Sequence, residues 1–159
     1  MSIIPSWLVI AGIATLVAFL LNRLDSEDIR WFNRLRRPSW LTFESAIPFI
    51  WIFIFTCGVI SANEVWETAP NTNYTWFLMG CYLLWEITII AYTPVTCKLR
   101  SLNIGTIIGA TTFFAGLIVT LLVFPVSSKA AWLIVPHLLW SPIGTFVTWQ
   151  MISLNPGDA

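Results

Sequence analysis

The sequence contains few charged residues. Asp, Glu, Lys and Arg make up only 10% of its 159 residues, 57% are hydrophobic, and the formal net charge is zero. A soluble globule of this length needs more charged surface, so the composition places the chain among membrane proteins. Neither a basic tract nor a charge run is present, which argues against a nucleic-acid partner.

Catalytic and metal-binding motifs are also missing. The sequence has no G-x-S-x-G motif, no glycine-rich phosphate loop and no H-E-x-x-H motif, and His137 is its one histidine. Its three cysteines, Cys57, Cys81 and Cys97, lie in or at the ends of apolar stretches and form no C-x-x-C pair. We expect buried thiols, with no disulfide and no metal site.

Long apolar runs are what the sequence does have. Since a hydrocarbon core of about 30 Å requires about 20 apolar residues in a helix, the runs predict an all-α membrane protein. Five spans are predicted: Ile3–Leu21, Ala46–Trp66, Trp76–Val95, Leu102–Phe124 and Ala130–Ser153. The first has no Lys or Arg before it and is too long for the core of a signal peptide, so we expect it to stay as a helix. We predict one domain over residues 1–159, a bundle of five transmembrane helices.

Positive charges predict the orientation of the bundle. Seven of the eight Lys and Arg residues fall in the first and third loops: Arg23, Arg30, Arg34, Arg36, Arg37, Lys98 and Arg100. Only Lys129 falls on the opposite side. The positive-inside rule therefore predicts that the N-terminus lies outside and that the first loop and the C-terminus are cytoplasmic.

The first loop, residues 22–45, is the one long connection. It carries Trp31, Phe32, Trp40 and Phe43 among its charges, which suits either an interfacial belt on the lipid headgroups or a lid over a site. Residues 28–35 are expected to form a short amphipathic helix before Pro38.

Ten tryptophans are more than membrane anchoring needs, and an indole also serves as a flat pocket wall. Tyr82, Trp85 and Glu86 share one face of the third span. An ionisable group within a membrane marks a functional site by default; the equal alternative is that Glu86 joins helices as a hydrogen-bonded carboxyl.

The fifth span carries a similar stripe: His137, Trp140, Ser141, Gly144 and Thr148. Small and polar residues in this pattern favour close helix packing or a cavity wall. A haem-ligand or proton-shuttle role for His137 is weaker than a structural one, because no second ligand accompanies it.

The rise of 1.5 Å per residue places several of these residues at matching depths. It predicts a cavity roofed by the first loop and lined by Trp40, Trp51, Glu86, Trp140 and Gly144. In the fourth span, Gly105, Gly109 and Gly116 favour close helix contact, either within the chain or in a homodimer.

Two ordered groups of motifs resemble the tryptophan-rich sensory protein and translocator protein (TspO/MBR) family. The first group is similar to the family's W-x-x-L-x-x-P-S-W loop and P-x-x-W helix motif, and it covers residues 31–40 and 47–51. The second is similar to the family's P-Y-x-x-W, A-T and L-N series, and it covers residues 136–140, 144–145 and 154–155.

The resemblance implies a five-helix bundle, often dimeric, with a pocket under the first loop that binds porphyrins and, in some members, sterols or synthetic aromatic ligands. It assigns the pocket to Trp40, Trp51, Trp140 and Gly144, with Trp31 as a lid residue. Tyr82 stands where the family has Asn, and His137 stands where it has Tyr. Thr148-Trp149-Gln150-Met151 lacks the weak sterol-associated pattern, which makes cholesterol binding doubtful.

The leading hypothesis is a membrane receptor or carrier that binds protoporphyrin IX or haem as a ligand and requires no cofactor. The macrocycle would stack between indoles, and its propionates would meet Arg34, Arg36 and Arg37. One alternative, implied by the resemblance, is an enzyme that breaks down porphyrin in light and oxygen through Trp51 and Trp140. The other is a membrane scaffold without a small-molecule ligand.

Overall fold

The computed structural model describes residues 4–159, which form helices joined by short loops and one long loop. The helices are α1 (Ser6–Leu21), α2 (Ser26–Arg34), α3 (Ile47–Thr68), α4 (Asn73–Leu99), α5 (Leu102–Val123) and α6 (Ser128–Leu154), with 3-10 turns η1 (Glu44–Ala46) and η2 (Pro156–Asp158). The five long helices confirm the predicted all-α bundle, and α2 is the short helix predicted inside the first loop. Ile3, where the first predicted span begins, lies outside the described residues.

Helix α4 extends well beyond the predicted span Trp76–Val95. Helix α4 has 27 residues and continues through Pro94 to Leu99, where Arg100 ends it in a left-handed conformation with a φ of 49°. Helix α6 also has 27 residues and nearly coincides with its predicted span, Ala130–Ser153. The hydropathy of a sequence finds only the part of a helix that lies in hydrocarbon, while polar terminal turns continue the helix into the headgroup region.

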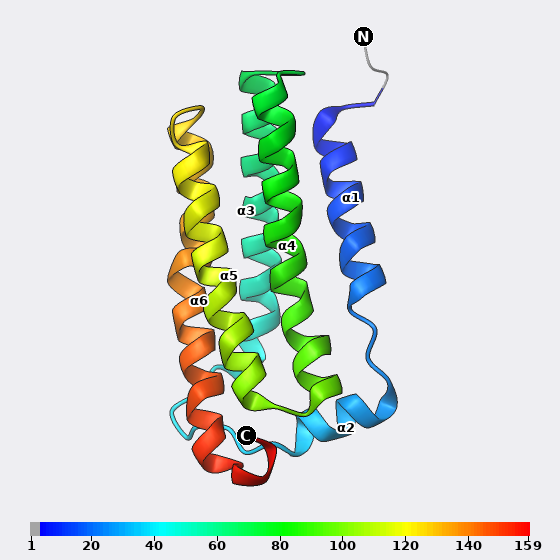
Figure 1. Cartoon of the computed structure of the whole chain (residues 1–159), viewed down its shortest axis with the longest axis vertical. Helices are drawn as coiled ribbons and strands as arrows, with labels where there is room; N and C mark the ends of the chain where they lie inside the picture. Colours follow the sequence, from blue (N-terminus) through cyan, green and yellow to red (C-terminus); the bar gives the residue numbers. More distant parts are fainter. Residues whose placement is uncertain (1–3) are drawn as a thin grey trace.

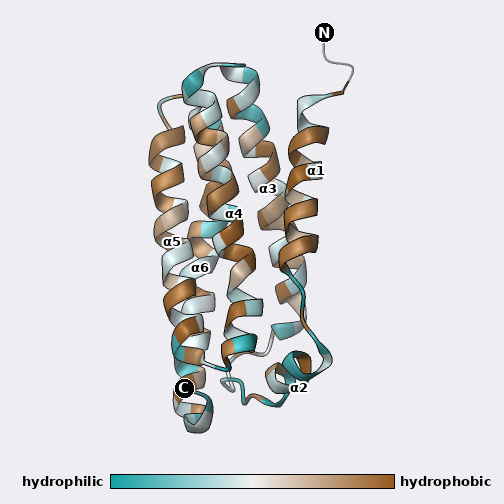
Figure 2. Cartoon of the chain, turned by 45° about the vertical axis from the view of Figure 1, so that its right-hand side comes forward, coloured by the Kyte–Doolittle hydropathy of each residue, from teal (hydrophilic) through white to brown (hydrophobic). Residues whose placement is uncertain are grey.

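Helices α3 to α6 are long and apolar enough to cross a membrane. Helix α1 has only 16 residues, and the chain bends by 86° between it and α2. Large apolar side chains cover the outside of the bundle: Phe49 is 72% exposed and Trp132 is 68% exposed. Figure 2 shows hydrophobic residues along the helices and hydrophilic ones mainly at their ends and on α2. The protein is therefore a multi-pass integral membrane protein.

The long helices run side by side, and α2 lies across one end of the bundle (Figure 1). Helix α5 packs between α4 and α6, and α6 also packs against α3. Helices α3 and α4 touch little, and α1 packs against both of them. The bundle is thus a ring of α3, α6, α5 and α4, with α1 covering the open side between α3 and α4.

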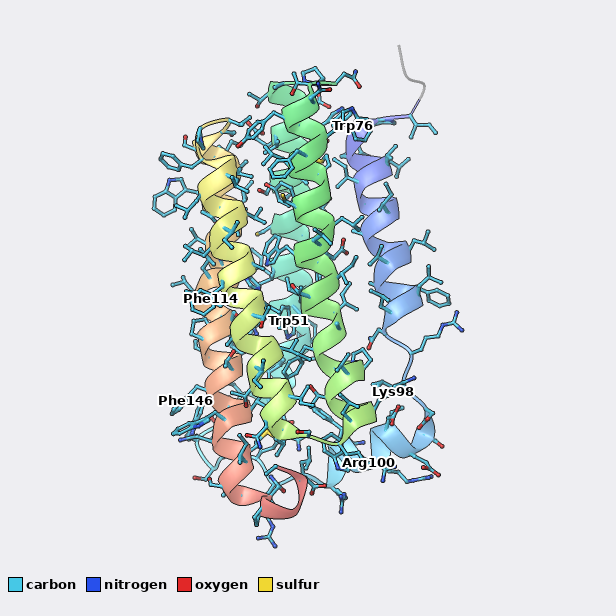
Figure 3. All side chains as sticks on the ribbon, in the orientation of Figure 1. Trp51, Trp76, Lys98, Arg100, Phe114 and Phe146 are labelled. Carbon is cyan, nitrogen blue, oxygen red and sulfur yellow. The ribbon has the colours of Figure 1, made fainter. Side chains whose placement is uncertain are left out.

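The end of the bundle at α2 also holds the C-terminus, Lys98 and Arg100 (Figures 1 and 3). We call it the basic end. Arg100 pairs there with Glu27 of α2 across 3.4 Å. A second ion pair joins Lys129 of α6 to Glu64 of α3 across 2.7 Å.

Helix α2 begins with a capping box. The Asp25 carboxylate accepts hydrogen bonds from the backbone N–H groups of Glu27 and Asp28, each at 2.9 Å. These backbone bonds, that of Asp28 first, hold the pKa of the Asp25 carboxyl below its usual value. The cap sets where α2 starts after the sharp bend from α1.

Glycines form the contact of α5 with its neighbours. A Cβ on Gly109 would lie 2.6 Å from Thr145 Oγ1 of α6, and a Cβ on Gly116 would lie 2.8 Å from His137 Nδ1 and 3.0 Å from Trp85 Nε1. The glycine spacing left open whether these residues make contacts within the chain or in a homodimer. In the structure, Gly109 and Gly116 make contacts within the chain. The homodimer stays a prediction.

Candidate functional site

A cavity of about 440 Å³ lies inside the basic half of the bundle. All five long helices, α2 and the first loop contribute to its wall. Its size falls within the range of about 300 to 1,000 Å³ that is usual for small-molecule sites. The fold creates it because α3 and α4 stay apart and because α1 and its C-cap offer only small or polar side chains there, Ala18 and Asn22.

Two indoles line the cavity, Trp51 from α3 and Trp140 from α6. Figure 3 shows Trp51 inside the bundle, in contrast to Phe114 and Phe146 on its outer surface. Phe43 of the first loop contacts Trp140 edge-on, with ring centroids 6.4 Å apart. The cavity therefore has aromatic surfaces on two different helices, and one of them is supported by the loop.

Arg37 and Glu44 of the first loop also belong to the cavity wall. Arg37 Nε lies 3.1 Å from Glu44 Oε1, and its Nη1 donates a hydrogen bond of 2.7 Å to the Leu35 carbonyl. The guanidinium also lies over the Phe32 ring, 4.7 Å from the centroid. Arg37 is thus held in place from three sides, with half-exposed Glu44 as its one acidic partner.

Hydroxyl groups line the deeper wall, on Tyr92, Thr93, Thr112, Ser141, Thr145 and Thr148. Most are satisfied within the protein: Tyr92 bonds Thr148, and Thr112 bonds Ser141 at 3.1 Å. Thr145 Oγ1 is buried without a hydrogen-bond partner in the described part of the chain. Its oxygen packs against Gly109 of α5.

Sequence reasoning missed the α4 and α5 members of this hydroxyl wall. A signal was present in α4, where Ile89, Tyr92, Thr93 and Thr96 recur at the spacing of one helical face. No comparable pattern marks Thr112. Its position on the wall depends on how α5 rotates against α6, which the sequence of α5 alone does not fix.

Four of the predicted site residues lie together on the cavity wall: Trp51, Trp140, Gly144 and Arg37. Trp40 is not on this wall. Its indole N–H donates to Gln150 Oε1, and its ring packs 6.0 Å from that of Phe146, on the outside of α6. The loop thus presents Phe32 and Leu41 to the cavity where a tryptophan was predicted.

Tyr82, Trp85 and His137 lie in the core outside the cavity wall. Since Ser61 Oγ donates to the Ala130 carbonyl at 2.7 Å, the Tyr82 hydroxyl donates to Ser61 and joins α4 to α3 and α6. The rings of Trp85 and His137 meet edge-on with centroids 5.0 Å apart. The Trp85 N–H and both His137 nitrogens are buried without a partner among residues 4–159.

Glu86 also lies away from the main cavity. It lines a separate groove between α1 and α3, although it shares a helix with Tyr82 and Trp85. The sequence-based prediction grouped Glu86 with Trp51 and Trp140 by depth along the helices alone. Depth carries no information about direction around the helix, which is why Glu86 was grouped with the wrong wall.

Trp31, Arg34 and Arg36 hold the first loop to the C-terminus. Trp31 is 3% exposed, its N–H donates to Asp158 Oδ1 at 2.8 Å, and Arg34 pairs with the same oxygen at 2.7 Å. The Arg36 backbone N–H donates to Asn155 Oδ1 at 2.8 Å, while the Asn155 amide donates back to the Arg36 carbonyl at 3.0 Å. None of the three lines the cavity, so Arg37 is the one predicted propionate partner within reach of it.

Comparison with known proteins identifies the family of the chain. The model of the TspO/MBR family matches residues 7–154, which include all six helices except the first residue of α1. The chain belongs to the TspO/MBR family. The match confirms the resemblance stated from the motifs and covers nearly the whole bundle, including the first loop and the cavity wall.

Three curated relatives are similar over most of their length. The Tryptophan-rich protein TspO of Bacillus cereus is 27% identical over 80% of this chain and 82% of its own. The uncharacterized membrane protein YtaB of Bacillus subtilis is 27% identical over the same shares of the two chains. Protein CrtK of Rhodobacter capsulatus is 22% identical over 80% of each chain.

Proposed function

We propose that this protein binds a tetrapyrrole, such as protoporphyrin IX or haem, in the main cavity and acts as a receptor or carrier for it. The observation that carries the proposal is the pair of indoles, Trp51 and Trp140, on the wall of a 440 Å³ cavity. A flat macrocycle can stack on such faces, and each good aromatic contact adds about 0.5–1.5 kcal/mol beyond its burial.

The cavity wall suits the two ends of such a ligand. The propionates would face Arg37, where a charge-assisted hydrogen bond can replace that of half-exposed Glu44. The apolar edge of the macrocycle would lie against apolar side chains of the wall, such as Phe55, Ile89 and Val147. With seven of the eight basic residues at the first and third loops, we place the basic end in the cytoplasm and the opposite end outside.

Binding in this cavity does not require an iron ligand from His137, because that side chain is 1% exposed and packed against Trp85. Protoporphyrin IX and haem are therefore expected to bind with similar affinity. An affinity for haem at least about tenfold higher would mean that iron coordination, and hence a different site, dominates.

The direct test is a titration of protoporphyrin IX in the dark into protein embedded in nanodiscs, following the Soret band. We expect saturable binding at low micromolar concentration or tighter, with a loss of affinity in Trp51→Phe/Trp140→Phe. Binding no stronger than to empty nanodiscs would remove the tetrapyrrole assignment and favour the scaffold or another apolar ligand.

Arg37 has a matched control one residue away. Arg37→Gln is expected to weaken binding about tenfold at low salt and less at high salt, because a charge-assisted bond is lost. Arg36→Gln removes the same charge from the same loop, but its side chain lies off the cavity wall, so binding should stay unchanged. Equal losses in both variants would show that the loop acts only through its net charge.

A second candidate function is oxidative breakdown of the bound tetrapyrrole in light and oxygen. It is favoured by the placement of two oxidisable indoles directly on the cavity wall. Repeating the titration under light separates the two functions. Several turnovers per protein to a defined product, abolished by Trp51→Phe without loss of dark binding, would establish an enzyme; bleaching without turnover would leave the receptor or carrier.

A further inference from the structure

A second hollow lies on the α1 side of the bundle. It has a volume of about 610 Å³, and twelve residues of α1, α3 and α4 line it. Eleven come from α1 and α3, including Trp7, Ala11 and Ala14; the twelfth is Glu86 of α4. We call this hollow the α1 groove. It adjoins the main cavity, since Ala18 and Phe55 line both, but Glu86 lines only the groove.

The construction of α1 keeps the groove open. None of its residues is buried, and alanines at positions 11, 14 and 18 form its groove side. Near its beginning, the Ser6 hydroxyl bonds Asn63 and Glu67 of α3, which fixes the distance between the two helices there. Small side chains below this link leave space instead of filling it.

Glu86 is the one acidic group of the groove, and it lies deep in the membrane. It stands 13 residues from each end of the 27-residue α4, which is about 20 Å of helix on either side. The side chain is half-buried and makes no hydrogen bond or ion pair with the described residues. The basic residues are in the loops or close to helix ends, and Lys129 is paired with Glu64.

A carboxyl in hydrocarbon that lacks a partner within the chain is costly, and ionisable groups in such positions are characteristically functional. The complementary group is a base that can itself enter from lipid. An apolar molecule with an amine meets this requirement, because its neutral free base partitions into the bilayer and its nitrogen accepts the Glu86 proton.

We propose that the α1 groove is a binding site for lipophilic amines, with Glu86 as the residue that selects the amine. On binding, the O–H bond of the Glu86 carboxyl breaks and an N–H bond forms on the ligand, giving an ammonium–carboxylate pair with no net charge. The apolar body of the ligand lies against α1 and α3, beside Trp7. The site is independent of the tetrapyrrole function and could exist without it.

The test compares two fluorescent probes that differ only in the polar group, 1-pyrenemethylamine and 1-pyrenemethanol. Each is titrated into protein in nanodiscs of zwitterionic lipid, with excitation of tryptophan and detection of pyrene emission, against empty nanodiscs. We expect the amine to bind wild-type protein about tenfold more tightly than Glu86→Gln, while the alcohol binds both proteins equally. Glutamine keeps the shape and hydrogen-bonding capacity of the side chain but cannot transfer a proton.

A second pair of variants tests the location. Ala14→Leu places bulk in the groove, whereas Gly12→Leu places the same side chain where a Cβ meets nothing within 4 Å. The amine should lose affinity in Ala14→Leu and keep it in Gly12→Leu. An amine affinity that is unchanged by Glu86→Gln or by Ala14→Leu would overturn the proposal, whatever the result of the porphyrin titration.

Discussion

The contact between α5 and α6 and the contact between α1 and α3 join apolar helices in opposite ways. On α5, Gly109 and Gly116 leave no room even for a methyl group, because Thr145, Trp85 and His137 fill the space. On α1, the residues at 11, 14 and 18 are also small, yet a 610 Å³ groove remains beside them. Small residues therefore produce close packing only where large side chains on the partner helix enter the space that they leave.

This difference divides the bundle into a rigid wall and an adaptable one. The α5–α6 side has its residues locked by neighbours, so it can hold the hydroxyls of the cavity in fixed positions. The α1 side has no buried residues and few links, so it can move to admit a ligand from the membrane. The main cavity and the α1 groove both include residues of this adaptable side.

The largest effect is expected from adding the same side chain to both regions. Gly116→Leu should destabilise the protein by about 3 kcal/mol, because overpacking forces the Trp85 and His137 rings apart. Gly12→Leu should change stability by less than about 0.5 kcal/mol. Thermal unfolding in nanodiscs measures both, and equal melting temperatures would contradict the division into two kinds of wall.

Removing the link between α1 and α3 should have a smaller effect. Ser6→Ala takes away the hydroxyl that bonds Asn63 and Glu67, at a cost of about 1 kcal/mol, and hydrogen exchange of the α1 amides should accelerate. Thr111→Val is the matched control, since its hydroxyl bonds only Ile107 of its own helix. If both variants leave α1 exchange unchanged, the Ser6 link does not hold the helix.

The smallest effect is expected at the junction of α1 and α2. Since the pKa of the Asp25 carboxyl is lowered by the backbone N–H of Asp28, its stabilising effect is present above the ordinary value of 3.8 and lost as the pH falls below it. Asp25→Asn keeps an acceptor without the charge. Hydrogen exchange of the α2 amides should therefore be faster in the variant at pH 7, and the difference should shrink as the pH falls below 3.8. A difference that persists at low pH would contradict a role for the charge.

Apolar length alone predicted the five-helix bundle, because each hydrophobic run is a local property of the chain. Amphipathic spacing likewise predicted α2 before Pro38. The cavity was predicted in part: Trp51, Trp140 and Gly144 lie at similar depth and also point to the same space. For these three residues, the depth along the helix and the direction around the helix both place the residue at the cavity.

Direction around a helix could not be predicted, and this accounts for the positions of Glu86 and Tyr82 outside the cavity wall. Trp40 lies in the first loop, where contacts with distant residues decide its position. Glu86 faces α1, a helix whose contact with α4 follows from the gap between α3 and α4 and leaves no local pattern. Trp40 lies outside the cavity because Gln150 and Phe146, more than 100 residues away, provide its partners. Tyr82 is held by Ser61 of a different helix.

The central claim is that a tetrapyrrole binds inside the main cavity. Gly144 lines it, and a Cβ there meets nothing within 4 Å, so Gly144→Leu should fill the cavity without disturbing the fold. Gly80→Leu is the matched control, since its Cβ also meets nothing within 4 Å but Gly80 lies on the exposed surface of α4. Dark titration of both variants with protoporphyrin IX should show binding weakened by about tenfold or more in Gly144→Leu and wild-type binding in Gly80→Leu. Wild-type affinity in a correctly folded Gly144→Leu protein would contradict the account.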